Sequence, residues 1–273
     1  MKTLIWLYRS LPWFKGKMRL GKRLFAFRLN LTEPISFKAH GGILYHLPNT
    51  KENLGQELFI NGIYEHDIVS FLQKQIPDGA LYFDIGANIG SLGLPIIKVK
   101  PKIRYYGFEA SPMVFNYLKK NFQDNQIIHY ELYNTLVHKD DNQKLKFYQS
   151  ELYGKSSLSP TYSREYIEVE SICLDSFCLK SNIESIDWMK VDVQGFEVFV
   201  FEGMKDMLRK KKVKNILFEF ERWAEEAAEL KAGTAMEYMR SMDYDLFYIN
   251  GKPWGTGGPK NNTMIWARPK HSH

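Results

Sequence analysis

The sequence predicts an α/β fold with a mostly parallel seven-stranded sheet, an antiparallel edge, and helices on both faces. Short β-rich runs alternate with helical stretches from about residue 81 onward, and a glycine loop, GANIG, follows the first of these strands. Alternation of this kind implies right-handed crossovers and a sheet covered on both faces. No complete helix separates the last two strands, which predicts that one edge is antiparallel.

The composition is that of an ordinary globular protein. The chain has 273 residues, of which 44% are hydrophobic and 25% charged, with 19 Gly, 11 Pro and 2 Cys. These values exclude collagen-like, coiled-coil, disordered and disulfide-stapled chains. Cys173 and Cys178 have no Cys or His pair at zinc-ligand spacing, so two free thiols are expected. No apolar run reaches the roughly 18 to 20 residues of a spanning helix, and we expect a cytoplasmic protein, either free or peripheral to a membrane.

Residues 1–60 are predicted to form a basic N-terminal helix with a lead-in region, and residues 61–273 the main domain. In the stretch Met1–Phe14, helical spacing places Leu4, Leu7, Tyr8 and Leu11 on one face, with Lys2, Arg9 and Ser10 opposite. Residues 31–62 contain short apolar stretches broken by Gly and Pro, which favours strands and turns. A helix is predicted over Glu65–Gln75 and ends before Pro77-Asp78-Gly79.

Charge is concentrated at the N-terminus. The chain has 37 Lys and Arg against 31 Asp and Glu, but residues 1–30 hold eight of the basic residues and none of the acidic ones. The remainder therefore has a slight acidic excess. Two readings of the basic helix stay open: a peripheral contact with an anionic membrane or substrate, or a first helix that packs on the domain with a solvated edge. No nucleic-acid partner is expected, because no RNA-binding or helix–turn–helix pattern accompanies these residues.

The elements of the main domain follow in order along the chain. Strands are predicted at 81–84, 103–108, 127–136, 188–191, 215–219, 246–249 and 263–267. Helices are predicted after the glycine loop to about 98, over 114–122, from 195 to about 211, and over 223–242. A hairpin formed by 145–149 and 167–172 is expected to be an addition around a polar loop.

Acidic residues stand at the carboxyl ends of four predicted strands: Asp84, Glu109, Asp192 and Glu219. Ligands of open parallel sheets bind at this edge, and burying a lone carboxylate is costly, so the four acids indicate a binding site. The loop is GxxxG, from Gly86 to Gly90, rather than the GxGxxG of dinucleotide binders, which disfavours a nicotinamide-dependent oxidoreductase. An acid before the loop disfavours a pyrophosphate, and Glu109 is placed to bind ribose hydroxyls. A phosphate-free nucleoside bearing a cationic amino acid, as in S-adenosylmethionine, satisfies both conditions.

Longer segments resemble a known family. They are GIYEHD at 62–67, FDIGANIGS at 83–91, GFEASPMVFNYLKKNF at 107–122, LYNTL at 132–136, MKVDVQGFEVFVFEG at 189–203 and NILFEFE at 215–221. In order and spacing they resemble the FkbM-type family of class I S-adenosylmethionine-dependent methyltransferases. The resemblance implies the Rossmann-like class I methyltransferase fold. The chain departs from the family pattern at Ala110-Ser111, and at Gln194, which replaces the usual acid.

The resemblance also implies roles for individual residues. Those expected to bind S-adenosylmethionine are Glu65, Asp84, Gly86, Ala87, Asn88, Gly90, Glu109, Ala110, Ser111, Asn134, Thr135 and Asp192. Among them, Glu109 is expected on the ribose, Asn134 and Thr135 near the adenine, and Glu65 toward the amino-acid end.

Methyl transfer to a hydroxyl needs in-line alignment and a general base. We expect Asp192 to be that base, because it ends a central strand next to the expected methyl group. Lys190 lies on the same strand face and would orient it, Glu197 would assist, and His66 is an alternative base. No metal is expected, since no third ligand accompanies Asp192 and Glu219.

The expected activity is O-methylation of a sugar, glycan or secondary-metabolite hydroxyl, with an acceptor that is either free or lipid-linked. N-methylation of a small molecule, or a binding protein without turnover, stay as alternatives. The acceptor pocket is expected to involve the lead-in region and the loops 154–164 and 250–262, with Tyr153, Tyr162 and Trp254. The sequence does not predict an oligomeric state.

Overall fold

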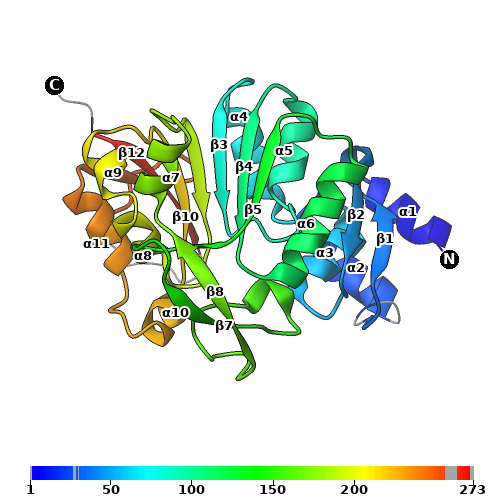
Figure 1. The fold of residues 1–273 in the computed structure, drawn as a ribbon. Helices are drawn as coiled ribbons and strands as arrows, with labels where there is room; N and C mark the ends of the chain where they lie inside the picture. The colour runs from blue at the N-terminus through cyan, green and yellow to red at the C-terminus, as the bar shows by residue number, and fades with distance from the viewer. Residues whose placement is uncertain (1, 27–28, 30, 256–262, 271–273) are drawn as a thin grey trace.

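The computed structural model describes residues 2–26, 29, 31–255 and 263–270, and its centre is a seven-stranded sheet (Figure 1). The strand order is β11-β12-β10-β9-β3-β4-β5. The strands are β3 (Leu81–Ile85), β4 (Arg104–Glu109), β5 (Tyr130–Asn134), β9 (Trp188–Val191), β10 (Ile216–Phe220), β11 (Tyr244–Tyr248) and β12 (Thr263–Pro269). Neighbours pair in parallel from β5 to β10, whereas β12 is antiparallel to both β10 and β11. The predicted fold class is confirmed, and the reversed strand is second from the edge.

Helices cover both faces of this sheet. They are α4 (His66–Gln75), α5 (Gly93–Val99), α6 (Pro112–Asp124), α7 (Leu174–Lys180), α8 (Glu197–Glu202), α9 (Lys205–Arg209), α10 (Arg222–Ala227) and α11 (Thr234–Ser241). Side chains alternate along β3, so Phe83 packs in a core with α7, α8, α9 and α11, while Tyr82 packs in the opposite core with α4, α5 and α6.

Three predicted elements differ in the structure. The helix expected over 195–211 is broken into α8 and α9, and the one expected over 223–242 is broken into α10 and α11. At the first break Gly203 lies against the chain at His138, whose carbonyl oxygen is 2.2 Å from where a Cβ would stand. At the second, Gly233 has φ 96°, a left-handed conformation that glycine adopts readily. The strand expected over 127–136 is divided between β5 and β6 (Leu136–Val137).

A small second sheet is added beside the main one. Its order is β6-β8-β7, and the predicted hairpin is confirmed as the antiparallel pair β7 (Lys144–Tyr148) and β8 (Tyr166–Ile172). The loop between them contains the short 3₁₀ helix η3 (Tyr153–Lys155). This sheet lies beside the main sheet near α10 (Figure 1).

The lead-in region is an integral layer of the molecule. It comprises α1 (Lys2–Ser10), α2 (Lys17–Phe25), β1 (Ile35–Lys38), η2 (His40–Gly42), β2 (Leu44–Leu47) and α3 (Asn53–Asn61). Tyr45 and Leu47 of β2 are fully buried in the core that also contains Tyr82. Asn121 of α6 accepts a hydrogen bond from the His46 amide at 2.7 Å. The expected boundary at residue 60 falls in the last turn of α3 and stays a prediction.

The first helix presents a different face to the protein than the sequence pattern predicts. It ends at Ser10, before Pro12. Ile5, Tyr8 and Arg9 are buried, whereas Leu4, Leu7 and Leu11 are exposed. The prediction that Arg9 lies on the solvated side is therefore wrong, and its guanidinium is instead bonded to backbone carbonyls. Of the described helices, none combines the length and the apolarity that crossing a bilayer requires.

Candidate active site

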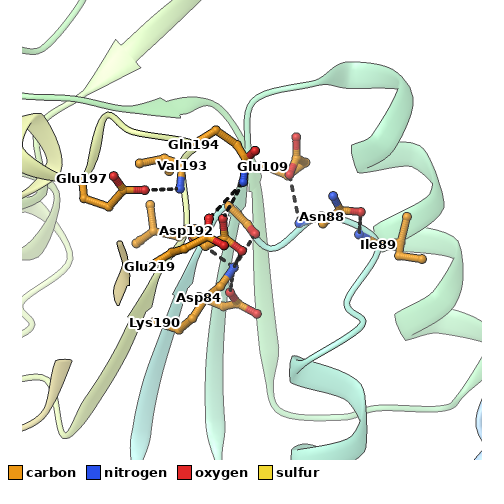
Figure 2. Close-up of polar contacts among 12 residues, drawn as sticks. Asp84, Asn88, Ile89, Glu109, Lys190, Asp192, Val193, Gln194, Glu197 and Glu219 are labelled. Carbon is orange, nitrogen blue, oxygen red and sulfur yellow. Dashed lines mark hydrogen bonds and ion pairs between the residues drawn. The ribbon is translucent and has the colours of Figure 1, made fainter. Parts of the chain in front are cut away.

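A cavity of about 630 Å³ opens where the parallel strands end. Its walls include the start of α3 with the loop before it, the start of α4, the glycine loop after β3, the ends of β4, β9 and β10, and the loop that contains η3. Its size is within the roughly 300 to 1,000 Å³ typical of ligand clefts. The acids predicted at strand ends converge here, as Figure 2 shows.

The glycine loop packs tightly against the neighbouring strand end. Gly86 has φ 72°, and a Cβ there would lie 2.0 Å from the carbonyl oxygen of Asp192. The amides of Gly86 and Ala87 both donate to the Phe108 carbonyl, at 3.0 and 2.9 Å. Glycine is required at this position because both the backbone conformation and the space exclude a side chain.

Glu109, the last residue of β4, holds the loop and faces the cavity. Its two carboxylate oxygens accept hydrogen bonds from the backbone amides of Asn88, at 2.9 Å, and Ser111, at 2.8 Å. Burial raises the pKa of Glu109 to about 7, while the two amides and the Lys190 charge oppose that rise. Each oxygen keeps a free lone pair, so the carboxylate can accept further hydrogen bonds from a pair of hydroxyls.

Lys190 of β9 lies at the base of the cavity and connects β9 to the end of β3. Its ammonium donates to the Gly86 carbonyl at 2.7 Å and lies 3.3 Å from Asp84 Oδ1 and 3.5 Å from Asp192 Oδ2 (Figure 2). Asp84 also accepts a hydrogen bond from the Tyr105 hydroxyl at 2.8 Å. Both Asp84 and Lys190 are almost fully buried, at 1% and 3% exposure. One cation therefore balances two carboxylates, which leaves the cluster with net negative charge.

Asp192 is the most exposed member of this cluster, with 29% of its side chain exposed. Gln194 donates to Asp192 Oδ1 and to Glu219 Oε2, both at 3.1 Å, and so bridges the two acids. Burial opposes ionisation of Asp192, but Lys190 and hydrogen bonds from Glu219 and Gln194 outweigh it and hold its pKa below the usual range. Burial and the Asp192 charge raise the pKa of Glu219 well above its usual value. Of the two neighbouring acids, Asp192 is therefore the one that ionises more readily.

Glu65 approaches the same cluster from the start of α4. It has a left-handed backbone with φ 47°, and it lines the cavity beside Tyr64. Burial and the Asp192 charge raise the pKa of Glu65 to about 7.

The structure brings most of the predicted residues to the cavity and leaves others outside it. Those that line it are Glu65, Gly86, Ala87, Asn88, Glu109, Ala110, Thr135, Lys190 and Asp192. Those that do not line it are His66, Asp84, Gly90, Ser111, Asn134 and Glu197. Two of these residues support others that do line the cavity: Asp84 pairs with Lys190, and the Ser111 amide donates to Glu109.

Glu197 and His66, both considered for proton transfer, face other surroundings. The Glu197 carboxylate accepts hydrogen bonds from the backbone amides of Val193 at 3.0 Å (Figure 2) and Gly195 at 3.3 Å. It therefore stabilises the turn before its own helix. His66 stacks on Trp13 with ring centroids 4.6 Å apart and lines a second, separate cavity.

Asn134 also acts on the backbone. Its amide donates to the carbonyls of Glu109 at 2.8 Å and Ala110 at 3.2 Å, so it holds the end of β4 in place.

Three further residues line the cavity that were not individually predicted from the sequence, although Lys155 lies in the predicted loop 154–164. Lys155 of η3 donates to Gln194 Oε1 at 3.1 Å and lies 4.0 Å from Glu221. Glu52 accepts from the Gly154 amide at 2.9 Å, and burial raises its pKa to about 7. Tyr64 lines the wall beside Glu65. No local pattern marks these residues, because contacts between distant segments bring them together.

The expectations about the acceptor loops have mixed outcomes. Residues 154–158 and Tyr162 line the cavity, as does Tyr153. Trp254 does not, because it is buried against Tyr248 with ring centroids 4.5 Å apart. Residues 256–262 lie outside the described part of the chain. Within the part that is described, no three His, Cys, Asp or Glu side chains form a group that could hold a metal ion.

Comparisons with known proteins agree with this architecture. The family model of the methyltransferase FkbM domain matches residues 84–246. The 2-O-methyltransferase NoeI of Sinorhizobium fredii is 29% identical over 160 residues, which cover 52% of this chain and 63% of that protein, slightly less than two thirds of its length. Methyltransferase 1 of Beauveria bassiana is 25% identical over 175 residues, covering 57% of this chain and 68% of that protein.

Solved structures resemble the chain more distantly. Precorrin-6y C5,15-methyltransferase from Geobacter metallireducens has a TM-score of 0.44 and 13% identity, covering 76% of this chain and 88% of its own. TYW2 of M. jannaschii in complex with AdoMet has a TM-score of 0.42 and 13% identity, covering 87% of this chain and 85% of its own. Scores at this level say nothing about the cofactor or the acceptor of this chain.

Proposed function

Because this chain belongs to the methyltransferase FkbM domain family, we propose that it is an S-adenosylmethionine-dependent O-methyltransferase. Its acceptor would be a hydroxyl of a sugar, a glycan or a secondary metabolite. The observation that carries the proposal is that the Asp192 carboxylate is 29% exposed to a cavity that Glu109 also lines, with each Glu109 oxygen accepting only one backbone amide and so able to accept a hydroxyl as well.

The cavity residues fit S-adenosylmethionine better than a dinucleotide. Glu109 would hold the ribose, and the loop at Gly86 and Asn88 would allow close backbone approach. Glu65 would face the cationic amino-acid end, and Asp192 would lie beside the methyl group. A pyrophosphate would meet uncompensated carboxylates at the same place, which is electrostatically unfavourable. When bound, S-adenosylmethionine supplies an electrophilic methyl group on a sulfonium.

The residues of this chain would align the acceptor and take its proton. Asp192 is held in one orientation because Lys190 contacts one of its carboxylate oxygens and Gln194 donates to the other, so the lone pairs that remain are fixed relative to the cavity. The acceptor hydroxyl would pass its proton to Asp192. Before that transfer, the hydrogen bond between Glu219 and Asp192 would share the negative charge of the Asp192 carboxylate. Positioning of this kind lowers the activation free energy of a reaction by up to roughly 7 to 11 kcal/mol. A general base raises the rate of the step about 10²- to 10⁴-fold.

The choice of a hydroxyl acceptor is supported by the relative named as a 2-O-methyltransferase. It is also supported by the outer half of the cavity, where Lys155, Glu52 and Glu221 provide both donors and acceptors among the aromatic rings of Tyr153 and Tyr162. Polar groups beside aromatic faces suit a polyhydroxylated ring.

The test combines binding and turnover in one variant. Asp192→Asn should keep the affinity for S-adenosylhomocysteine within about threefold in calorimetry. It should lower methylation of a panel of methyl glycosides at least about tenfold, because an amide cannot take the proton. Asp245→Asn, an exposed acid on β11, is the control. Unchanged turnover in Asp192→Asn would remove this residue as the base, and a wild-type chain that binds NAD but not S-adenosylhomocysteine would overturn the proposed activity.

A further inference from the structure

Exposed apolar side chains are concentrated in the first two helices and in the segment that connects them. Of the fourteen large apolar side chains exposed in the described part of the chain, eight lie between residues 4 and 24. They are 40% to 59% exposed, and they are Leu4, Trp6, Leu7, Leu11, Trp13, Phe14, Leu20 and Leu24. We call these eight side chains the N-terminal apolar surface. An exposed apolar group of this kind in a folded protein indicates an interaction site.

The two helices that carry this surface are fixed to the protein by their other face. The Arg9 guanidinium is buried and donates to the carbonyls of Phe59, at 3.0 and 2.5 Å, and Lys38, at 2.6 Å, while lying 4.4 Å from the Phe37 ring. Lys17 is also buried and donates to the Leu11 carbonyl at 2.6 Å. Arg9 and Lys17 thus form hydrogen bonds inside the protein, and these bonds fix the two helices so that their apolar side chains face outward.

Close packing of α2 on the neighbouring helix adds to this anchoring. A Cβ on Gly21 would lie 2.2 Å from the Ile60 side chain of α3. Tyr8 and Phe25 pack edge to face at 5.3 Å, in a cluster with Phe59 and Ile60. The inner face of the helix pair is therefore packed against the protein, whereas the eight outer side chains stay 40% to 59% exposed, with Trp13 stacked by one face on His66.

Positive charge accompanies the outer face. On α2, Arg19 and Arg23 form one exposed row and Leu20 and Leu24 form the next, each pair four residues apart. No acidic residue precedes Glu33 in the sequence. Figure 1 shows α1 and α2 together at one edge of the molecule, outside the β1–β2 hairpin.

We propose that α1 and α2 dock on the surface of an anionic phospholipid bilayer. Trp and Leu side chains beside a basic row match the apolar boundary and anionic headgroups of such a membrane. A second copy of this chain fits less well, because it would bring two acid-free basic surfaces together. The inference does not depend on the proposed catalytic function.

The test is sedimentation of the full chain with vesicles of phosphatidylcholine alone or with about 30% phosphatidylglycerol, an anionic lipid. The wild-type chain should bind the anionic vesicles at least about tenfold more strongly than the neutral ones, and raised salt should weaken this binding. The double variants Arg19→Glu with Arg23→Glu, and Leu7→Gln with Leu20→Gln, should each reduce it about tenfold or more. Circular dichroism and thermal unfolding would verify that both variants fold.

Matched controls lie at other sites on the surface. Lys210→Glu with Lys212→Glu repeats the charge change, and Ile128→Gln with Leu179→Gln repeats the loss of exposed apolar side chains. Both controls should bind vesicles like the wild type. Absence of vesicle binding, equal binding to neutral vesicles, or equal losses in the controls would each overturn the proposal. A wild-type dimer that Leu7→Gln with Leu20→Gln converts to a monomer, without vesicle binding, would assign the surface to a second copy instead.

Discussion

Three residues around the cavity adopt a left-handed backbone although they are not glycine. They are Glu65, Asn88 and Gln194, with φ of 47°, 51° and 57°. Such conformations cost on the order of 1 to 3 kcal/mol and persist where the surroundings enforce them. Here each one aims a group at the site: the Glu65 carboxylate toward Asp192, the Asn88 amide at Glu109, and the Gln194 side chain between Asp192 and Glu219. Gln194 departs from the usual acid of the family pattern, and its amide donates to both Asp192 and Glu219, which an ionised carboxylate could not do.

The variant Glu109→Gln tests the nucleoside-binding role of the β4 end. Both oxygens of this carboxylate accept backbone amides, so a glutamine must turn its NH₂ group toward one of those donors. Hydrogen bonds to a charged group contribute about 1.5 to 3 kcal/mol. We therefore expect a 10- to 100-fold weaker affinity for S-adenosylhomocysteine in calorimetry. Glu168→Gln, exposed on β8, should leave it unchanged, and a similar loss in both variants would contradict the assignment.

Glu197 provides a pH prediction for stability. Burial raises its pKa to about 8, against an ordinary value of 4.5. The folded protein therefore holds this proton more tightly than the unfolded chain, so the contribution to stability is complete below pH 4.5 and is lost as the pH rises through 8. Between about pH 6 and pH 8 the loss from this group is about 2 kcal/mol.

Glu197→Gln should remove that part of the pH dependence, because the amide oxygen still accepts from Val193 and cannot ionise. The free energy of unfolding in urea, measured at both pH values, checks this. A variant that loses as much stability as the wild type over the same interval would show that Glu197 is not the titrating group.

At the scale of elements, the sequence predicted those features that depend on residues close to one another in the chain. The seven strands, the glycine loop and the added hairpin follow from apolar runs and turn residues, and the strand-end acids of the site follow from the convergence of parallel strands. The breaks between α8 and α9 and between α10 and α11 were not predictable, because the spacing of apolar residues continues across them. Glu52 and Lys155 were missed for a related reason, since tertiary contacts between the lead-in region and the η3 loop place them at the cavity.

The break before α11 depends on one buried side chain. Glu225 of α10 accepts hydrogen bonds from the amides of Gly233, at 2.5 Å, and Ala235, at 3.0 Å, and so satisfies the first turn of α11. Glu225→Ala leaves both donors buried without partners and should cost about 1 to 3 kcal/mol in the free energy of unfolding. The exposed neighbour Glu226→Ala is the control. If urea denaturation gives equal stabilities for the two variants, Glu225 does not cap the helix.

At the scale of the whole molecule, opposite charges are separated in space. Residues 1–30 contain eight basic residues and no acidic one, and α1 and α2 lie at one edge of the molecule, whereas the rest of the chain has a slight acidic excess. Part of that excess converges on the cavity, where Lys190 balances only some of it. The cavity is therefore negative, which suits a cationic ligand. The edge that carries α1 and α2 is positive, which suits an anionic surface.

This negative cavity predicts a pH-dependent preference for cationic nucleosides. Glu65 and Glu109 both have a pKa of about 7, so raising the pH from about 6 to about 8 ionises them and adds negative charge beside Asp192. Sinefungin carries an extra ammonium group where S-adenosylhomocysteine has a neutral sulfur. Its affinity relative to S-adenosylhomocysteine should therefore rise about tenfold over this interval in calorimetry, a coupling of about 1.4 kcal/mol. Glu65→Gln should flatten the rise, because it removes one of the two titrating acids while Asp192 stays ionised. A preference that is constant, or that falls as the pH increases, would mean that these carboxylates do not face the cationic end of the ligand.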